Sequence, residues 1–277
     1  MRTSLIQLTS SDDPLRNTAL VCDFIDQAAE GGAAFVLTPE VTNCVSLVRA
    51  HQFSVLRHEA DDPTLAAVRE RAARHGIWIL IGSLALRTSD ADGRFANRSF
   101  LIAPDGAIAA RYDKIHMFDV AVSEAETYHE SQGYRPGAQA VITPMPFGIL
   151  GMTICYDLRF AQLYRHLAQA GASVITVPSA FSRPTGEAHW ETLMRARAID
   201  TGAYILAPAQ TGVHAAQSGG SRQTWGHSLI VDPWGTVLED AGERPGMITV
   251  DLDPKAVAKA RASIPAMTQE TEFVGPQ

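Results

Sequence analysis

The sequence predicts an α/β fold with a mixed β-sheet, and three observations carry this prediction. Short apolar segments typical of buried strands alternate with longer segments typical of helices. Two strand pairs are separated by Pro-Asp-Gly (104–106) and Pro-Trp-Gly (233–235), which favour antiparallel hairpins. No linker rich in glycine, serine or proline divides the 277 residues, so we expect a single domain over residues 1–277.

The N-terminal half should alternate between strands and helices. Asp13-Pro14 and Asp62-Pro63 fit helix starts, because aspartate caps the first turn and proline fits within it. The expected elements are strands at 4–8, 33–37, 77–81, 98–103 and 107–112, and helices at 14–30 and 63–75. Residues 116–137 carry little periodicity and are predicted to form a long loop, which in a compact domain usually has a function.

The C-terminal half continues the alternation. The expected elements are strands at 148–155, 173–177, 204–207, 226–231, 236–238 and 247–252, and helices at 158–170, 187–200 and 254–262. Residues 210–223 are polar and glycine-rich, which favours a surface loop. The tail from about Ile264 to Gln277 has little pattern, so we expect it to fray or to dock on a partner subunit.

Composition narrows the class of protein. Hydrophobic residues make up 46% of the chain and charged residues 19%, which fits a globular protein. The net charge of -7 is scattered, so we expect no nucleic-acid partner. The N-terminus lacks the apolar stretch of a signal peptide, and no apolar run approaches the ~20 residues that cross a bilayer. Cys22, Cys44 and Cys155 lack CxxC spacing, so we expect a cytoplasmic protein without disulfides, metal or cofactor.

Three reactive side chains follow predicted strands. Glu40, Lys114 and Cys155 each stand at the carboxyl end of a strand, where sites assemble in α/β sheets. A thiol is only a few per cent ionised at neutral pH and needs a base. Glu40 can act as that base if burial raises its pKa toward neutrality. Lys114 and the backbone N–H of Tyr156 can stabilise an oxyanion.

Spacing alone leaves other interpretations open. Cys155 could be a core residue, since free cysteines are among the most buried residues. Glu40 could be a helix cap or a surface carboxylate, and Lys114 could be an ordinary solvated lysine. Cys44 lies four residues beyond Glu40 and could be the reactive thiol instead.

Three motifs in order nevertheless resemble the nitrilase superfamily of carbon–nitrogen hydrolases. They are TPE, which ends at Glu40, YDKIHMFD, which contains Lys114, and GMTICYDLRF, which contains Cys155. The segments VPSAF, HWETLMRARAID and WGHSLIVDPWG follow in the family's order. The resemblance covers nearly the whole chain and implies that Cys155 is the nucleophile and Cys44 is structural. Ala161-Gln162 departs from the usual RFPE, which puts any role of that turn in doubt.

The resemblance also implies features that the strand and helix pattern does not predict. A second family glutamate corresponds to Glu130 in TYHESQGYRPG, where it would orient Lys114 and the substrate amide. The implied fold is a four-layer αββα sandwich with mixed sheets, and the implied assembly is a homodimer or a higher homo-oligomer. The overall pattern is most similar to the Nit branch, whose members act on deaminated glutathione or on omega-amides.

The predicted function is therefore that of a thiol amidohydrolase. It would cleave a small carboxylate-bearing carboxamide to an acid and ammonia through a thioester on Cys155. Arg183 and Arg159 are candidates to bind the substrate carboxylate, and Phe181 is a candidate to line the pocket. Nitrile hydrolysis, N-carbamoyl amino acid hydrolysis and a non-catalytic binding protein of the same fold are the alternatives.

Overall fold

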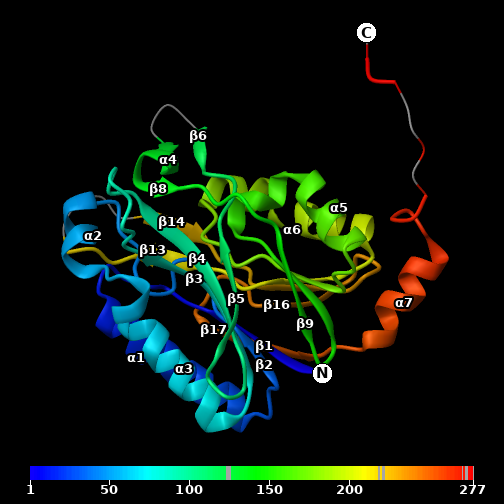
Figure 1. Ribbon diagram of the computed structural model, residues 1–277, viewed down its shortest axis with the longest axis horizontal. Helices are drawn as coiled ribbons and strands as arrows, with labels where there is room; N and C mark the ends of the chain where they lie inside the picture. Colours follow the sequence, from blue (N-terminus) through cyan, green and yellow to red (C-terminus); the bar gives the residue numbers. More distant parts are fainter. Residues whose placement is uncertain (123–125, 218, 220–221, 270, 272–273, 277) are drawn as a thin grey trace.

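Two β-sheets pack face to face, and helices cover their outer faces. The computed structural model describes residues 1–122, 126–217, 219, 222–269, 271 and 274–276. Figure 1 shows helices α1 and α3 on one side of the sheets and α5 and α6 on the other. The predicted α/β class and its αββα layering are thus confirmed.

The first sheet has the strand order β17-β1-β2-β3-β4-β5, and β8 pairs with β4. Its strands are β1 (Arg2–Gln7), β2 (Phe35–Leu37), β3 (Trp78–Leu86), β4 (Phe95–Ile102), β5 (Ile108–Asp113), β8 (Tyr134–Arg135) and β17 (Gly246–Asp251). β2 is parallel to β3, and β4 is antiparallel to both β3 and β5. The strands β2 and β5 therefore run in the same direction and end at the same edge of the sheet.

The second sheet has the order β16-β15-β12-β11-β10-β9. Its strands are β9 (Val141–Met145), β10 (Gly148–Met152), β11 (Val174–Thr176), β12 (Tyr204–Ala207), β15 (Leu229–Val231) and β16 (Val237–Asp240). β10, β11 and β12 are parallel, whereas β9 and β15 are antiparallel to their neighbours. This sheet is mixed as well, as the sequence predicts.

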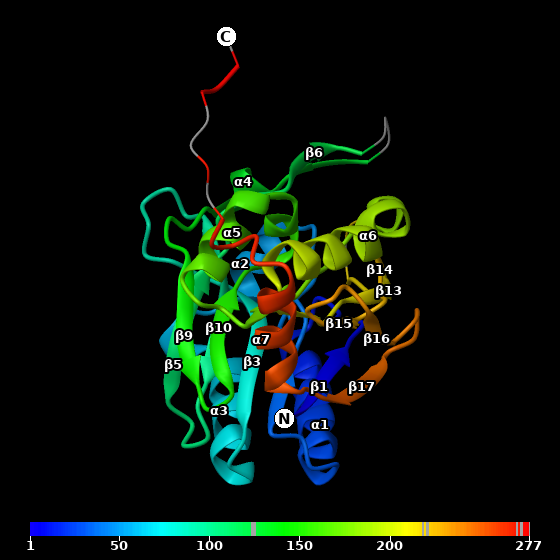
Figure 2. The same cartoon turned by 90° about the vertical axis from the view of Figure 1, so that its right-hand side faces the viewer.

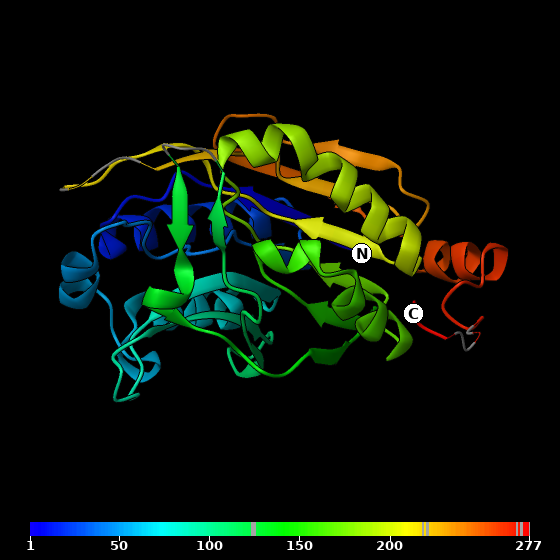
Figure 3. The same cartoon turned by 90° about the horizontal axis from the view of Figure 1, so that it is seen from above.

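Helices α1 (Pro14–Glu30) and α3 (Pro63–His75) cover the first sheet, and α5 (Ala161–Gln169) and α6 (Arg183–Thr201) cover the second. Figure 3 shows α6 lying along the strands of the second sheet. The predicted helix starts are confirmed, because the Asp13 side chain accepts from the N–H groups of Leu15 and Arg16, and the Asp62 side chain accepts from that of Leu65. The last helix, α7 (Pro254–Ser263), is capped in the same way by Asp253.

The core lies in all three interfaces between layers, because the cluster between the sheets continues to Trp190 and Met194 of α6. Between the sheets, Leu37 and Leu80 of the first sheet belong to one buried cluster with Met152 and Ile175 of the second. A separate cluster joins the other face of the first sheet to α1 and α3. Side chains alternate between the two faces of a strand, so each central strand contributes to both layers.

Two segments that were predicted to be loops contain secondary structure. Residues 116–137 include β6 (Asp119–Ala121), β7 (Thr127–His129) and α4 (Glu130–Gly133), while residues 123–125 lie outside the described part. Residues 210–223 overlap the hairpin of β13 (Thr211–His214) and β14 (Arg222–Trp225); residues 218, 220 and 221 lie outside the described part. Polar composition hid the second hairpin because its buried His214 is hydrogen-bonded to Ser10 and Thr224.

Several boundaries also differ from the prediction. Strand β9, the helix α2 (Arg49–Val55) and the short 3₁₀ helix η1 (Glu59–Asp61) are not among the predicted elements. Strand β10 ends at Met152, and Cys155 begins a 3₁₀ helix, η2 (Cys155–Arg159), so the following α-helix starts at Ala161. Helix α6 starts at Arg183, four residues before the predicted position, because Pro184 fits its first turn.

The described residues of the tail after α7 lie to one side of the packed layers in Figure 1 and extend upward from α7 in Figure 2. Its described apolar residues Ile264 and Val274 are 56% and 86% exposed. Among the described residues, no helix is both long and apolar enough to span a membrane.

Candidate functional site

Glu40 follows β2 and is held at the edge of the first sheet by three donors. Its Oε1 accepts from the Lys114 ammonium at 2.9 Å and from the Asn97 amide at 2.9 Å. Its Oε2 accepts from the backbone N–H of Ala180 at 2.9 Å. The residue is only 3% exposed. The carboxylate is therefore fixed in orientation and shielded from water.

Lys114 follows β5 and reaches the same edge. Its Nζ lies 2.9 Å from Oε1 of Glu40, and 2.9 and 2.7 Å from the two oxygens of Glu130. Lys114 is 2% exposed, so the alternative of an ordinary solvated lysine is wrong. A buried ammonium between two carboxylates is compensated electrostatically and held in one position.

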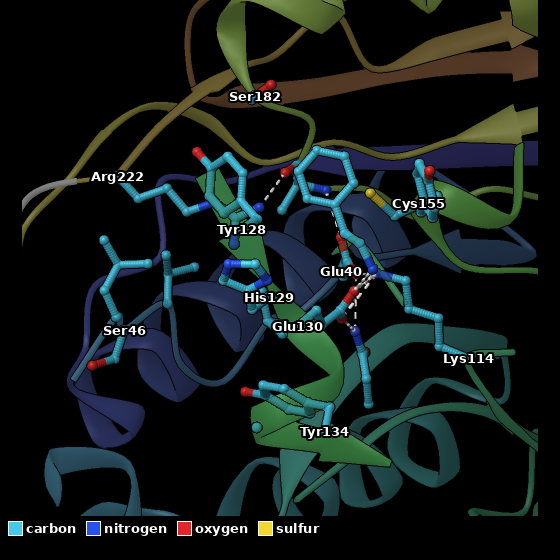
Figure 4. A pocket seen from close by; sticks show the side chains of 18 of the residues that line it. Glu40, Ser46, Lys114, Tyr128, His129, Glu130, Tyr134, Cys155, Ser182 and Arg222 are labelled. Carbon is cyan, nitrogen blue, oxygen red and sulfur yellow. Dashed lines mark hydrogen bonds and ion pairs between the residues drawn. The ribbon is translucent and has the colours of Figure 1, made fainter. Parts of the chain in front are cut away.

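Glu130 is the first residue of α4, within the segment that was predicted to be a loop. Besides Lys114, its Oε2 accepts from the backbone N–H of Phe118 at 2.6 Å, and its Oε1 accepts from Asn97 at 3.3 Å. The structure thus brings Glu130 to Lys114, as the resemblance implied. Figure 4 shows Glu40, Glu130 and Lys114 pointing toward one another beside Cys155.

Cys155 stands on a strained turn after β10. Its φ of 51° lies in the left-handed region, which non-glycine residues rarely adopt. The backbone N–H of Cys155 donates to the carbonyl of Pro178 at 2.9 Å, and that of Ile154 donates to the buried Asp157 carboxylate at 2.9 Å. Asp157 also accepts from the Tyr112 hydroxyl at 2.6 Å. These bonds hold a conformation that points the thiol into a cavity.

The charges of the site determine the protonation states of Cys155, Glu40 and Lys114. Burial raises the pKa of the Cys155 thiol, and the nearby Glu40 carboxylate raises it further, so the thiol is protonated. Burial would also raise the pKa of Glu40, but Lys114 and Arg222 outweigh burial and lower it below its ordinary value. The expectation that burial raises the Glu40 pKa toward neutrality is therefore wrong. Burial would lower the pKa of Lys114, yet Glu130 and Glu40 outweigh it and keep the side chain charged.

These side chains line a cavity of about 290 Å³. Glu40, Lys114, Glu130 and Cys155 all belong to its wall, and Tyr156 and Phe181 line it as well. Cys44 also lines it, but its pKa is raised to about 12 by burial, and its sulfur donates to the carbonyl of Asp12. The volume is close to the lower end of small-molecule sites, which are roughly 300–1,000 Å³.

The two arginines considered for carboxylate binding lie elsewhere. Arg183 begins α6, forms a surface ion pair with Glu243 at 3.1 Å and stacks over Trp225. Arg159 in η2 packs over the rings of Tyr156 and Phe181 and bonds to His189 at 3.2 Å. The described lining of the cavity includes neither arginine. Arg183 lies in α6 because this helix begins before the predicted start at residue 187.

Among the cavity residues that the sequence pattern does not mark, Asn97 and Arg222 are the two with the clearest effect on the site. Asn97 lies in the interior of β4 and bridges Glu40 and Glu130, and no motif marks it. Arg222 lies in the segment predicted to be a surface loop and lines the cavity. Side-chain contacts across long sequence distances join both residues to the site: Asn97 reaches the two glutamates, and Arg222 reaches the carbonyl of Ala180. Within the described ranges, no group of histidine, cysteine and acidic side chains could hold a metal ion.

The two packed sheets and a pocket at their strand ends define an αββα-sandwich enzyme. The chain matches the carbon–nitrogen hydrolase family over residues 2–262 and belongs to that family, as the sequence motifs predicted. It is therefore a carbon–nitrogen hydrolase.

Relatives and solved structures are similar over nearly the whole chain. A deaminated glutathione amidase of Yersinia enterocolitica is 38% identical over 98% of this chain and 93% of its own length. The human omega-amidase NIT2 is 36% identical over 97% of this chain and 94% of its own length. The NitFhit protein of C. elegans superposes with a TM-score of 0.88 and 33% identity, over 97% of this chain but only 64% of that longer one. A Nesterenkonia amidase, whose structure carries acrylamide on its active-site cysteine, has a TM-score of 0.77, 26% identity and coverage of 95% and 98%.

Proposed function

We propose that this protein hydrolyses a small carboxylate-bearing amide through a thioester on Cys155. The observation that carries the proposal is the Lys114 ammonium, which is shared by Glu40 and Glu130 at 2.7–2.9 Å beside the Cys155 thiol. This arrangement brings together a base (Glu40), a fixed positive charge (Lys114) and a nucleophile (Cys155) in one buried site.

In the first half of the reaction, Glu40 accepts the Cys155 proton as sulfur bonds to the amide carbon. The protonation states of the two side chains suit this step, because Glu40 is ionised and the thiol carries its proton. Proton transfer is unfavourable before substrate binds, so it accompanies formation of the S–C bond. Lys114 and the backbone N–H of Tyr156 stabilise the oxyanion.

In the second half, Glu40 gives that proton to the nitrogen as the C–N bond breaks. Water then attacks the thioester carbonyl while Glu40 accepts a proton from it. The C–S bond breaks, the acid leaves, and the proton returns to the sulfur. Glu130 holds Lys114 in place through both halves, and its contact with the Phe118 N–H fixes its own position.

The relatives' names support amides of a dicarboxylic acid as substrates. An omega-amide releases ammonia. In an amide of the deaminated-glutathione type, the nitrogen belongs to a dipeptide, so an amine leaves in its place. We therefore widen the predicted product from ammonia to ammonia or an amine, and both should be assayed.

The test is a substrate panel with the wild-type protein and Cys155→Ala. The panel contains alpha-ketoglutaramate, succinamate, deaminated glutathione, a nitrile and an N-carbamoyl amino acid. We expect turnover of one or more of the amides and at least a ~10³-fold loss in the variant, with an unchanged melting temperature. Turnover of only the nitrile or the ureido acid, or persistent activity in the variant, would refute the proposal.

We also infer a homodimer in a reducing compartment, the cytoplasm. The apolar residues of the tail, which leaves the packed layers, support the dimer, and the free thiols Cys22, Cys44 and Cys155 suit the compartment. Light scattering on the full chain should give twice the mass of 29.9 kDa. A monomer would refute the dimer, and fractionation of cells would test the location.

A further inference from the structure

Arg222 is a cation in the cavity wall whose guanidinium has an N–H donor without a partner. Its Nη2 donates to the carbonyl of Ala180 at 2.6 Å, whereas its Nε is buried and has no partner in the described structure. Its guanidinium packs over the ring of Tyr128, which also lines the cavity. Figure 4 shows Arg222 entering from the side of the pocket away from Lys114.

No carboxylate of the described residues forms an ion pair with Arg222. Glu40, whose pKa Arg222 helps to lower, is already engaged by Lys114, Asn97 and the Ala180 N–H. A partly buried guanidinium without an ion-pair partner is costly, because only the attraction of the more distant Glu40 carboxylate offsets its lost hydration. A bound anion would remove this cost.

The position of Arg222 also fits the charge that the site must tolerate. Glu40 and Glu130 carry two negative charges against the single positive charge of Lys114, so an anionic substrate meets repulsion at the reacting centre. Ala180 donates its N–H to Glu40 and accepts from Arg222 at its carbonyl, so the guanidinium lies near that centre. A carboxylate bound there would share one cavity with an amide at Cys155.

We propose that Arg222 binds the carboxylate of the substrate and thereby selects short amides of dicarboxylic acids over neutral amides. This inference rests on the proposed function and names the specificity residue of the same site. The planar guanidinium suits a carboxylate better than an ammonium does, because it donates in a fork. Arg183, with Glu243 as its partner at the surface, has no need of a substrate anion.

The experiment compares succinamate with pentanamide, a neutral amide of similar length, in the wild type and three variants. Arg222→Met should lower kcat/KM for succinamate by about 100-fold, mainly through KM, because a charged partner is lost. It should change kcat/KM for pentanamide by less than about threefold. Arg222→Lys should recover part of the loss, because it restores the charge but not the fork.

Arg183→Met is the matched control and should leave both substrates unchanged. Arg159→Met tests the competing arginine beside Tyr156 and Phe181. An equal loss on both substrates in Arg222→Met would mean that Arg222 only supports Ala180 or Glu40, and would overturn the inference. A loss specific to succinamate in Arg159→Met but not in Arg222→Met would overturn it as well.

A binding measurement keeps this inference separate from the proposed function. Succinate is titrated calorimetrically into the wild type and Arg222→Met, and a Kd at least ~30-fold weaker in the variant is expected. If the wild type hydrolyses no amide but succinate binding still depends on Arg222, the proposed function fails and the carboxylate site stands. If succinate binds both proteins equally, the carboxylate site is refuted whatever the activity.

Discussion

Oε2 of Glu40 accepts a hydrogen bond from the backbone N–H of Ala180 at 2.9 Å, across 140 residues of sequence. Glu40 follows β2 of the first sheet, and Ala180 follows β11 of the second. The bond therefore ties together the strand ends of the two packed sheets. The proposed base and the loop beside the proposed nucleophile share this junction, so the site depends on how the sheets pack.

Glu40→Gln should lower kcat by about 10²–10⁴-fold, because the amide cannot accept the proton of the Cys155 thiol. Glutamine still accepts from Lys114 and Asn97 through its carbonyl oxygen, whereas its NH2 faces the Ala180 N–H, so the fold should persist with a lower melting temperature. Steady-state kinetics and a thermal melt measure both effects. Glu191→Gln, at an exposed position of α6, is the control and should match the wild type. Near-normal turnover in Glu40→Gln would rule out its role as the base.

The pH dependence should lack a limb at the ordinary pKa of histidine. Activity needs ionised Glu40, whose pKa is lowered below 4.5 because Lys114 and Arg222 outweigh burial. The active carboxylate is therefore present above that pKa and is lost as the pH falls through it. We expect kcat/KM to be flat between about pH 5.5 and 8. An acid limb near pH 6.5 would indicate a histidine base instead.

Gly82→Ala should disrupt the junction of the two sheets. An added Cβ would lie 1.9 Å from the Thr38 carbonyl oxygen and 2.5 Å from the Pro178 side chain. Neither neighbour can move without shifting Glu40 or Cys155. Urea unfolding should show a loss of about 3 kcal/mol, with a large loss of kcat.

Gly246→Ala is the matched control for that substitution, because an added Cβ there meets nothing within 4 Å. Its stability should stay within about 0.5 kcal/mol of the wild type. Equal stability of the two variants would mean that the close packing around Gly82 is not needed.

Asp157→Asn should destabilise the turn that carries Cys155. The fully buried carboxylate accepts from the Ile154 N–H, the Tyr112 hydroxyl and the backbone N–H and ring of His116. An amide turns two of its hydrogens toward donors, so we expect a loss of about 2–4 kcal/mol. Asp251→Asn, at an exposed ion pair with Arg2, should leave the midpoint of urea unfolding unchanged. A similar midpoint for Asp157→Asn would show that the turn does not depend on the charge.

Local signals predicted much of the fold. The Asp-Pro pairs at 13–14, 62–63 and 253–254 each begin a helix, because aspartate capping acts within one turn and needs no tertiary contact. The hairpins at 104–106 and 233–235 are also local, and the pairing of β4 with β5 and of β15 with β16 confirms them. The hairpin of β13 and β14 was missed because hydrogen bonds, not apolar side chains, satisfy its buried positions.

By itself, the sequence determined the alternation of strands and helices, the family and the positions of Glu40, Lys114 and Cys155, since all are carried by short segments. Only the tertiary structure decided the rest. The left-handed turn at Cys155, the contacts of Asn97 with both glutamates and the entry of Arg222 into the cavity come from segments far apart in the chain. The lowered pKa of Glu40 also depends on the tertiary structure. Lys114 and Arg222 are distant in sequence, and their charges outweigh the effect of burial on this carboxyl group.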